Sequence, residues 1–578
     1  MGTWVHIFNV GIAYRRHFTL PLQLPKELFP CRHGFPLSTI VEDLPISRRQ
    51  FDYIIVGGGT AGCVIADRVA ENLPNATILM IEGGESELGK EEILNLNGAA
   101  DLWGSDMYDY SYRSVPQPYG NSNIIHSRAK MLGGCSSHNG AISFAPLAYD
   151  CKRWQDLGAE NWTHAEMLRL VRKLRNNIIP VDERHRSQLV KDWLKTCSEL
   201  FGVPHIDDFN REIEERGNLT TGCGFLSMAY TPENNHRSSA SVAYIHPILR
   251  GEVKRPNLTI LQNTWVSRIL FQGTTATGVT ATTKAGHEYS LVATSETVLC
   301  AGAIDTPRLM LLSGLGPREQ LATHQIPLVH DIPGVGENLQ DHAETMYMWE
   351  LHEAVPPEQV AMGSEGVMVL RREDINARGD DNDVMDSLFH MFTVPFDTYT
   401  KPMGYESPKN AFCVIPYTPR PASVGRLWLK SANPKDKPML DQRYFSDLEG
   451  YDKASNLFML KMARRMAQAE PFKKYIKREI APGAHITSDE DLCEYGRKVH
   501  NTVYHPCGTA KMGNVETDRM AVVDPSLKVR GVKHLRVADA SVFPCMTSIN
   551  PVITVLAIGE RAAELIIKDA CRTERAVL

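Results

Sequence analysis

Two short apolar runs with a helical pattern between them lie near residue 60 of the chain. Tyr53–Val56 and Thr77–Ile81 are apolar at nearly every position, as is typical of strands buried in a parallel sheet. Between them, Val64, Ile65 and Val69 follow the spacing of one face of a helix. The pattern predicts a strand, a helix and a second strand in this order.

A glycine-rich loop joins the first predicted strand to the helix. Residues 57–62 read GGGTAG and fit the pattern G-x-G-x-x-G. Gly57 permits a tight turn, Gly59 lets the backbone approach a pyrophosphate, and Gly62 lets the helix pack closely on the strand. The loop therefore predicts a phosphate-binding turn.

The start of this helix and the end of the second strand add two further features. The helix N-terminus, at Thr60 and Ala61, supplies unpaired N–H groups and the positive end of a dipole to a phosphate. Glu82 directly follows the second apolar run and can accept hydrogen bonds from a ribose. These features together predict a dinucleotide-binding site, for which both NAD and FAD are candidates.

A second pattern predicts another layer of structure. Residues 380–445 alternate apolar and polar positions with frequent prolines, which favours an antiparallel sheet. Residues 452–478 carry apolar side chains at helical spacing. The predicted fold class is α/β, as a composite with α+β character. It combines a Rossmann-like nucleotide-binding domain with an interleaved substrate domain of mixed antiparallel sheet and helices.

Length and charge narrow the class of protein. A chain of 578 residues is too long for one simple core, so two connected domains are expected. The 62 basic and 68 acidic residues give a net charge of −6, which gives no reason to expect nucleic acid as a partner. No apolar run reaches the roughly 18 residues of a membrane span. The 12 cysteines are scattered without the spacing of a zinc site, so no metal is expected.

The first 50 residues differ from the rest of the chain. Arg15, Arg16 and Arg32 occur there, whereas no acidic residue precedes Glu27. This composition is open to two interpretations, a mitochondrial presequence or an extension on the protein surface. The extension is favoured because the segment is poor in serine. With the scattered cysteines interpreted as reduced, we expect a cytoplasmic protein, with mitochondria as the alternative.

Several long motifs resemble the glucose-methanol-choline (GMC) oxidoreductase family. Besides the glycine loop, the chain contains GAIDTPRLMLLSGLG (302–316), PGVGENLQDH (333–342), HNTVYHPCGTAKMG (500–513) and RVADASVFPCMTSINPVITVLAIGERAAELI (536–566). They occur in the order of the family, and the resemblance covers about residues 51 to 567. It implies FAD as the cofactor and the fold of an enzyme that oxidises alcohols.

The resemblance also implies how the chain divides. Residues 51–345 and 500–578 would form the FAD-binding domain, with an insertion of the substrate domain near 146–220. Residues 346–499 would form the substrate-binding domain, and residues 1–50 remain an N-terminal extension.

Three further residues are candidates for holding FAD. Asp539 and Ala540 follow an apolar run and precede another helix, which gives a second set of N–H donors near the cofactor. Asp539 also fits the role of a helix cap. Val266 lies between two strand-like runs, at a position that helps to bind the adenine side in the family.

The resemblance assigns a catalytic pair. His505 precedes Pro506, which restricts its backbone to extended conformations, and it matches the catalytic histidine of the family. Its role would be that of the base, because histidine titrates near neutral pH. Asn550 fills the second catalytic position and can hold the substrate oxygen by a hydrogen bond. His500 has no such match, and we interpret it as a packing residue.

The loop MLGGCSSHNG (131–140) matches the choline oxidase branch of the family. In that branch the histidine of GGCSSHN carries a covalent bond to the flavin ring. His138 fills this position, between Gly134 and Asn139, so the resemblance implies FAD attached covalently to His138. The alternative is a histidine that forms hydrogen bonds to the flavin or to Asn139.

Departures from the choline oxidase branch bear on the substrate. A quaternary ammonium group needs aromatic faces and a carboxylate. Glu358 is a candidate for the carboxylate, but Gly363 and Ser364 stand where an aromatic pair is expected. Met403 stands where a further active-site histidine is expected. These departures favour a neutral primary alcohol over choline.

Other functions and partners remain open at this point. A choline dehydrogenase or oxidase proper, a lyase or photoenzyme on the same fold, and a catalytically silent flavoprotein are the alternatives. The expected partners are a small-molecule alcohol and oxygen or another electron acceptor, since Val503 beside the catalytic motif suits the approach of oxygen. The sequence leaves open whether the chain forms a homo-oligomer.

Overall fold

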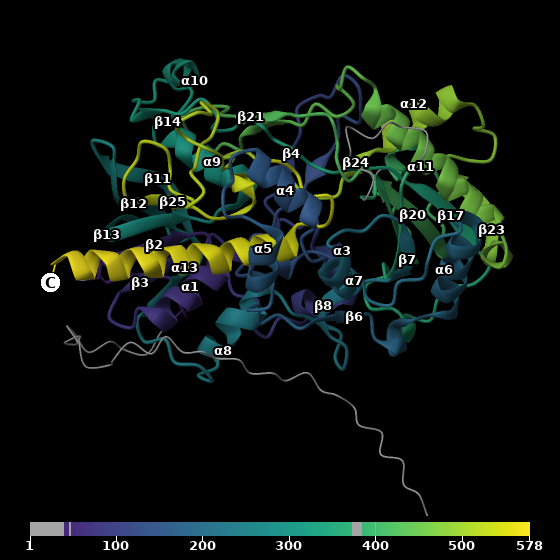
Figure 1. Ribbon diagram of the computed structural model, residues 1–578, viewed down its shortest axis with the longest axis horizontal. Coiled ribbons are helices and arrows are strands. Elements are labelled where there is room, and N and C mark those ends of the chain that lie inside the picture. Colours follow the sequence, from purple (N-terminus) through teal and green to yellow (C-terminus); the bar gives the residue numbers. More distant parts are fainter. Residues whose placement is uncertain (1–39, 46–47, 373–383, 399, 578) are drawn as a thin grey trace, which may run out of the picture.

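The computed structural model describes residues 40–45, 48–372, 384–398 and 400–577. Two sheets of eight strands each dominate it and lie side by side along the long axis of the molecule (Figure 1). Most of the expected N-terminal extension lies outside the described residues. Within it, β1 (Ile40–Val41) pairs in parallel with β10 (Leu258–Leu261) at the edge of the first sheet.

The first sheet is built on the predicted strand–helix–strand unit. Its order is β1-β10-β3-β2-β13-β12-β11, and β25 pairs with β13. The further strands are β2 (Gln50–Val56), β3 (Ile78–Ile81), β11 (Thr264–Gln272), β12 (Thr275–Thr283), β13 (Glu288–Leu299) and β25 (Leu535–Val537). Since β2 pairs in parallel with both β3 and β13, its carboxyl end lies at the centre of the sheet edge, where ligands of such sheets bind.

Helices from both ends of the chain cover this sheet. They include α1 (Thr60–Asn72), α9 (Gly302–Leu312) and α13 (Val552–Val577), with α5 (His164–Val171) and α8 (His246–Leu249) alongside. The long helix α13 packs along α1, and a Cβ atom on Gly559 would lie only 3.0 Å from Cβ of Val64. The C-terminal helix therefore completes the layer that the N-terminal unit begins.

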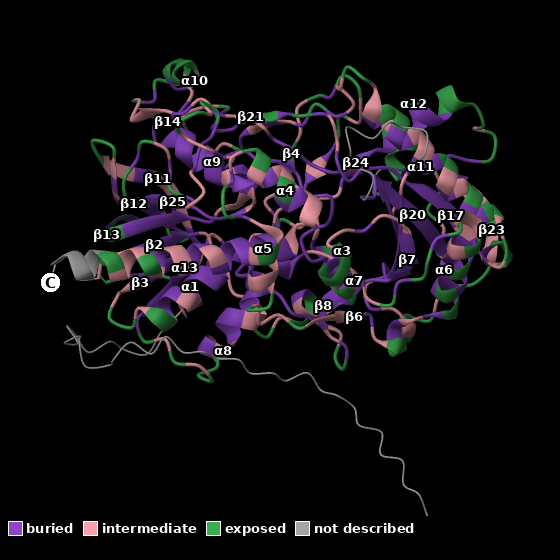
Figure 2. Ribbon diagram, viewed as in Figure 1, coloured by how far each residue is buried: buried purple, intermediate pink, exposed green. Residues whose placement is uncertain are grey.

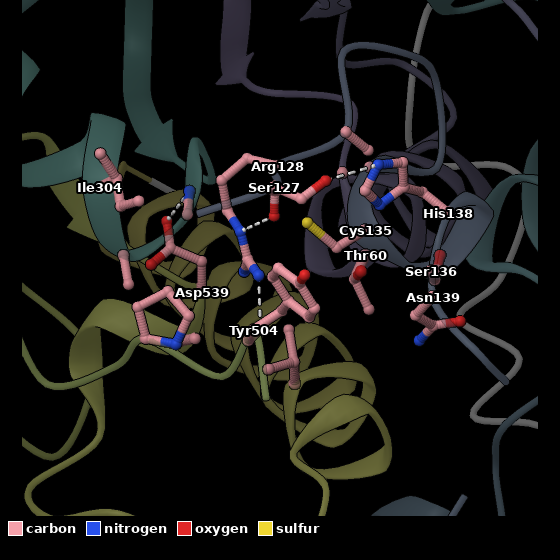
Figure 3. Close-up of a pocket in the computed structure, with 18 of the residues that line it drawn as sticks. Thr60, Ser127, Arg128, Cys135, Ser136, His138, Asn139, Ile304, Tyr504 and Asp539 are labelled. Atoms are coloured by element: carbon pink, nitrogen blue, oxygen red, sulfur yellow. Dashed lines mark hydrogen bonds between the residues drawn. The ribbon is translucent and has the colours of Figure 1, made fainter. Parts of the chain in front are cut away.

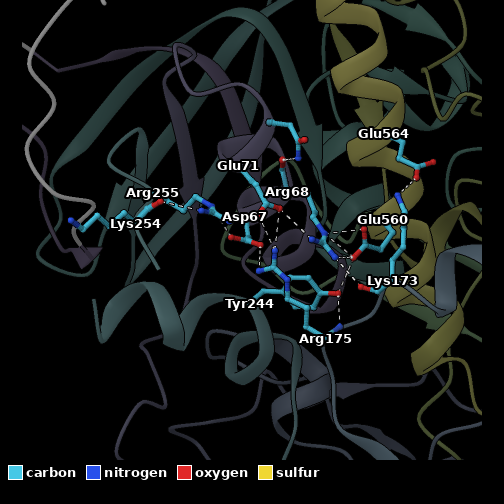
Figure 4. A network of polar contacts seen from close by, with 11 residues as sticks. Asp67, Arg68, Glu71, Lys173, Arg175, Tyr244, Lys254, Arg255, Glu560 and Glu564 are labelled. Carbon is cyan, nitrogen blue, oxygen red and sulfur yellow. Dashed lines mark hydrogen bonds and ion pairs between the residues drawn. The ribbon is translucent and has the colours of Figure 1, made fainter. Parts of the chain in front are cut away.

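A network of ion pairs joins α1 to α13 and to neighbouring loops (Figure 4). On α1, the buried carboxylate of Asp67 lies 2.6 Å from Arg175 and 3.0 Å from Arg255. The next residue, Arg68, lies 2.8 Å from Glu560 of α13. The network thus links three distant segments around one helix.

The second sheet is antiparallel in all its pairs. Its order is β23-β17-β20-β19-β18-β7, with β16 bridging β20 and β24. The strands are β7 (Gly222–Phe225), β16 (Ala343–Glu344), β17 (Tyr347–Leu351), β18 (Gly366–Leu370), β19 (Ser387–Phe392), β20 (Ala411–Tyr417), β23 (Ile476–Ala481) and β24 (Asn501–Thr502). The antiparallel sheet predicted near 380–445 is present in β19 and β20.

The helices of this half are α6 (Gln188–Phe201), α7 (Phe209–Arg216), α11 (Tyr451–Gln468) and α12 (Asp489–Val499). The helix predicted over 452–478 ends at Gln468, because Pro471 follows and residues 476–481 pair with β17 as β23. Shorter helices are α2 (Glu91–Leu94), α3 (Ala99–Leu102), α4 (Ala148–Asp156) and α10 (Arg318–Thr323).

Short strands form four small sheets outside the two large ones. They are β4 (Tyr112–Arg113) with β5 (Ile125–His126), β6 (Ile178–Pro180) with β8 (Ser227–Thr231) and β9 (His236–Arg237), β14 (Leu315–Gly316) with β15 (His330–Asp331), and β21 (Arg426–Trp428) with β22 (Met439–Asp441).

Each large sheet has its own buried core, seen as the purple strands of Figure 2. Leu427 and Leu440 of the β21–β22 hairpin pack in the first core, although 346–499 was expected to belong to the substrate domain. Strand β7, by contrast, pairs with β18 of the second sheet. The proposed domain boundaries therefore stay a prediction, whereas the composite α/β fold is confirmed.

Among the described residues, no helix is both long and apolar enough to cross a membrane. The 11 cysteines within the described ranges are all free thiols.

Candidate active site

One cavity of about 300 Å³ lies between the two cores. All the predicted site residues except Gly62 line it. They are Gly57, Gly59, Thr60, Ala61, Glu82, Gly134, His138, Asn139, Val266, His505, Asp539, Ala540 and Asn550. The fold thus brings the glycine loop, the GGCSSHN loop and the catalytic pair to a single pocket, although they are far apart in the sequence. Figure 3 shows Thr60 of the first loop near His138 and Asn139 of the second.

The geometry of the glycine loop requires glycine at both ends. Gly57 has a φ of +103°, and a Cβ atom on it would lie 2.5 Å from the carbonyl oxygen of Cys300. On Gly62 it would lie 2.0 Å from the carbonyl oxygen of Gly57. Any side chain at these two positions would therefore push α1 away from the turn.

The second glycine loop lies directly against the first. A Cβ atom on Gly134, whose φ is +53°, would lie 2.7 Å from Cα of Gly59. The N–H of Gly133 also donates to the carbonyl of Gly58 at 2.7 Å. Two backbones in contact leave an open cradle at the N-terminus of α1, and such a cradle fits a pyrophosphate.

Glu82 lies at the end of β3 beside this cradle. Its carboxylate accepts the N–H groups of Gly58, at 2.9 Å, and Gly84, at 2.8 Å. Burial raises its pKa to about 7, although these hydrogen bonds favour the charged form. Glu82 therefore orders the glycine loop as well as facing the pocket.

Asp539 joins two elements of the pocket wall. It accepts the N–H of Ser541 at 2.8 Å, that of Gly302 at 2.9 Å, and the hydroxyl of Thr306 at 2.6 Å. The helix expected directly after it is only a single 3-10 turn, residues 540–542, because α13 begins later, at Val552. Asp539 is thus a cap, but of a short turn and of the start of α9.

Val266 does not lie between two strands, as its sequence context suggested. It lies within β11, which begins two residues earlier, at Thr264. Only Gln262 and Asn263 separate this strand from β10. The second strand therefore begins earlier in the chain than the apolar pattern indicates. Val266 still lines the pocket.

His138 is buried in the wall of the pocket at the GGCSSHN loop. Its Nε2 lies 3.2 Å from the hydroxyl of Ser127 and 3.6 Å from the carboxylate of Asp109, and its carbonyl accepts the indole N–H of Trp103 at 3.0 Å. Burial lowers its pKa, with Asp109 opposing the shift. Figure 3 shows Ser127 between Arg128 and His138. The imidazole is held neutral and oriented.

His505 and Asn550 lie side by side in the pocket wall. Nδ2 of Asn550 lies 3.5 Å from Nε2 of His505, and Nδ1 of His505 lies 2.9 Å from Nδ1 of His342. The backbone N–H of His505 donates to the carboxylate of Asp341 at 3.0 Å. Burial, together with the neighbouring His342 and Arg128, places the pKa of His505 well below its usual value. A neutral imidazole is the form that can accept a proton.

The structure adds three pocket-side residues that the sequence did not single out. Glu344 and His390 line the pocket, and His342 lies behind His505. His342 is the last residue of the PGVGENLQDH motif, and Glu344 follows it two positions later. Their place at this motif is the only feature of the sequence that could have indicated them. His390 lies in the buried strand β19, where a histidine looks like an ordinary core position.

Two residues used in the argument about substrate lie elsewhere. Met403 is 38% exposed in a short turn and does not line the pocket, and Glu358 is exposed. His390 and Glu344 line the pocket in their place, besides the predicted histidines and acidic residues. The prediction failed here because loop residues were matched by their order along the chain, which does not give their depth in the fold. His500 is buried outside the cavity, as expected of a packing residue.

Comparison with known proteins shows which class of protein this fold and pocket define. Models of the GMC oxidoreductase family match residues 51–344 and 421–559. The chain is 38% identical to choline oxidase of Arthrobacter globiformis over 532 residues, covering 90% of this chain and 95% of that protein. It is 31% identical to an alcohol dehydrogenase [acceptor] of Pseudomonas putida, covering 90% and 96%.

A solved structure agrees with these relatives. The crystal structure of pyridoxine 4-oxidase from Mesorbium loti superposes with a TM-score of 0.79 at 25% identity, covering 89% of this chain and 98% of that one. The chain therefore belongs to the GMC oxidoreductase family. It is an FAD-dependent enzyme that acts on the CH–OH group of alcohols.

Proposed function

We propose that this enzyme oxidises a primary alcohol whose far end carries a positive charge, with choline as the model compound. One observation carries the proposal: the pocket that holds His505 also holds a buried carboxylate, Glu344, whose Oε1 accepts the amide N–H of Asn501 at 2.9 Å. Burial raises the pKa of Glu344 to about 8, so its charged form is disfavoured in the pocket unless a cation compensates it.

Aromatic side chains of the same pocket support a cationic substrate. Trp103, Phe392, Phe396 and Tyr504 line it, and they are in mutual contact. Trp103 lies 5.5 Å from the ring of Tyr504 and 6.2 Å from that of Phe396, which in turn lies 5.5 Å from Phe392. Such faces attract quaternary ammonium groups. They supply the aromatic faces that Gly363 and Ser364 lack, and we therefore propose a cationic alcohol in place of the neutral alcohol that the sequence favours.

The residues of the chain suggest how the alcohol is activated. Nε2 of His505 accepts the hydroxyl proton, and Nδ2 of Asn550 donates to the oxygen as negative charge develops on it. Bound FAD supplies the acceptor for the hydride that leaves the carbon atom, so that the alcohol becomes an aldehyde. Glu344 and the aromatic side chains hold the other end of the molecule, which fixes the reacting carbon in place.

The proposal includes a covalent bond between FAD and His138. The buried, neutral imidazole is supported by Ser127 and Asp109, and the glycines beside it let the backbone approach a ring closely. Oxygen is the proposed final electron acceptor, supported by the oxidases among the relatives and by Val503, an apolar residue of the pocket wall.

A comparison of two alcohols of the same shape tests the substrate class. Choline and 3,3-dimethylbutan-1-ol differ in the charge of one central atom, and kcat/KM for choline is expected to be higher. At a pH above 8, where Glu344 is charged, this preference should fall roughly 10- to 100-fold in Glu344→Gln, since loss of one partner of a buried charge pair costs about 2 kcal/mol.

Glu358→Gln is the matched control, because this exposed carboxylate lies outside the cavity. It should keep the preference of the wild type. If the wild type oxidises the neutral alcohol as well as or better than choline, the substrate is a neutral alcohol and the proposed charge recognition is wrong.

A further inference from the structure

The catalytic pair belongs to a chain of hydrogen bonds that begins and ends on one segment, residues 417–419. At one end, Nε2 of His342 lies 2.9 Å from the carbonyl oxygen of Pro419. A carbonyl can only accept a hydrogen bond, so Nε2 of His342 carries the hydrogen. This end fixes the direction of every bond that follows.

The first consequence concerns the tautomer of His505. Burial lowers the pKa of His342 to about 3, so its ring is neutral and Nδ1 has a lone pair. Nδ1 of His505, 2.9 Å away, must therefore donate to it. This leaves a lone pair on Nε2 of His505, the atom that faces Asn550 and the pocket.

The second consequence concerns the amide of Asn550, whose nitrogen and oxygen are set by their partners. A lone pair on Nε2 of His505 favours the NH₂ group of Asn550 on its side, at 3.5 Å. Oδ1 of Asn550 then faces the hydroxyl of Tyr417, at 3.3 Å. Because an amide oxygen only accepts, the hydroxyl of Tyr417 donates and closes the chain.

We propose that Tyr417 is a positioning residue that fixes the amide orientation of Asn550, so that an N–H group points to the alcohol oxygen. Tyr417 is the last residue of β20 and is fully buried. Its ring also stacks on His342, with 4.4 Å between centroids and an angle of 27°. One side chain thus holds Asn550 through its hydroxyl and supports His342 through its ring.

The chemical effect appears when the alcohol lies between the two catalytic residues. Its hydroxyl group donates to Nε2 of His505 while its oxygen accepts from Nδ2 of Asn550. If the amide turned over, Oδ1 would face the oxygen on which negative charge develops and would repel it. The inference rests on the proposed roles of His505 and Asn550.

Tyr417→Phe is the decisive variant, since it keeps the stacked ring and removes only the donor. With choline under anaerobic conditions, the rate constant of flavin reduction should fall roughly 5- to 10-fold, the weight of one neutral hydrogen bond. The dissociation constant for choline and the content of FAD should stay at wild-type values. Tyr405→Phe, whose ring packs on Tyr495 outside the cavity, should change neither.

A double-mutant cycle separates positioning from general packing. In an Asn550→Ala background, Tyr417→Phe should have no further effect, because the amide that it orients is gone. An equal slowing in both backgrounds, or a wild-type rate in Tyr417→Phe alone, would overturn the inference. His505→Ala, measured in parallel, tests the proposed base: if it is slow while Tyr417→Phe is not, only the role of Tyr417 fails.

Discussion

The carboxylate of Asp67 lies 2.6 Å from Nη1 of Arg175, a residue 108 positions further along the chain. Arg255 contacts the same carboxylate at 3.0 Å, and the Asp67 side chain is fully buried (Figure 4). The glycine loop leads into the start of α1. The ion pairs fix α1 in place and thereby support the loop that would bind the cofactor.

Asp67→Asn should destabilise the protein by about 3 kcal/mol, because Arg175 and Arg255 lose their buried counter-charge and keep only the partly exposed carboxylate of Glu71. The free energy of unfolding in urea measures this. Glu214→Gln is the control, since Glu214 and Arg172 form a pair that is mostly exposed, and such pairs contribute at most about 1 kcal/mol. An equal effect of the two substitutions would show that the buried network has no special weight.

His505→Ala should retain FAD and slow flavin reduction by roughly 10²–10⁴-fold, the usual contribution of a positioned general base. His505 lies outside the two glycine loops, which would hold the phosphates, so FAD should stay bound. Anaerobic stopped-flow absorbance with choline gives the rate, and the flavin spectrum gives the occupancy. His500→Ala is not a suitable control, because the ring of His500 is buried. His287 is exposed, so His287→Ala is the control and should react at the wild-type rate. A wild-type rate in His505→Ala would remove the proposed base.

Denaturation with acid should leave the flavin colour in the pellet of the wild-type protein if FAD is bound to His138. In His138→Ala the colour should move to the supernatant, while the folded variant still binds FAD through the glycine loop. Mass spectrometry of the tryptic peptide that contains His138 should show the added flavin mass. Complete release of FAD from fully occupied wild-type protein would show that the bond does not exist.

The affinity for a cationic alcohol should rise with pH. Burial raises the pKa of Glu344 to about 8, with the neighbouring carboxylate of Asp341 adding to the shift and Asn501 opposing it. Glu344 is therefore protonated below this pKa and becomes a carboxylate as the pH rises through it. We expect kcat/KM for choline to increase over this range, more than kcat/KM for 3,3-dimethylbutan-1-ol. Parallel profiles for the two alcohols would exclude Glu344 as the titrating group.

The sequence by itself determined the features that depend on short stretches of chain. The strand, loop and helix around Gly57–Gly62 follow from apolar periodicity and from backbone geometry that only glycine adopts, and Glu82 lies where the next strand ends. The long motifs around His505 and Asn550 likewise identified the family and its cofactor, which the comparisons confirm.

Only the tertiary structure decided what surrounds the catalytic pair. The two-residue strand β16 pairs with both β20 and β24, which brings Glu344, Tyr417 and Asn501 together from three distant segments. No periodicity marks so short a strand, and the order of residues in a loop does not give their depth. For this reason Met403 and Glu358 were assigned to a pocket that is in fact lined by His390 and Glu344. Motifs carry local backbone geometry, whereas the shape and charge of a pocket arise from long-range pairing of strands.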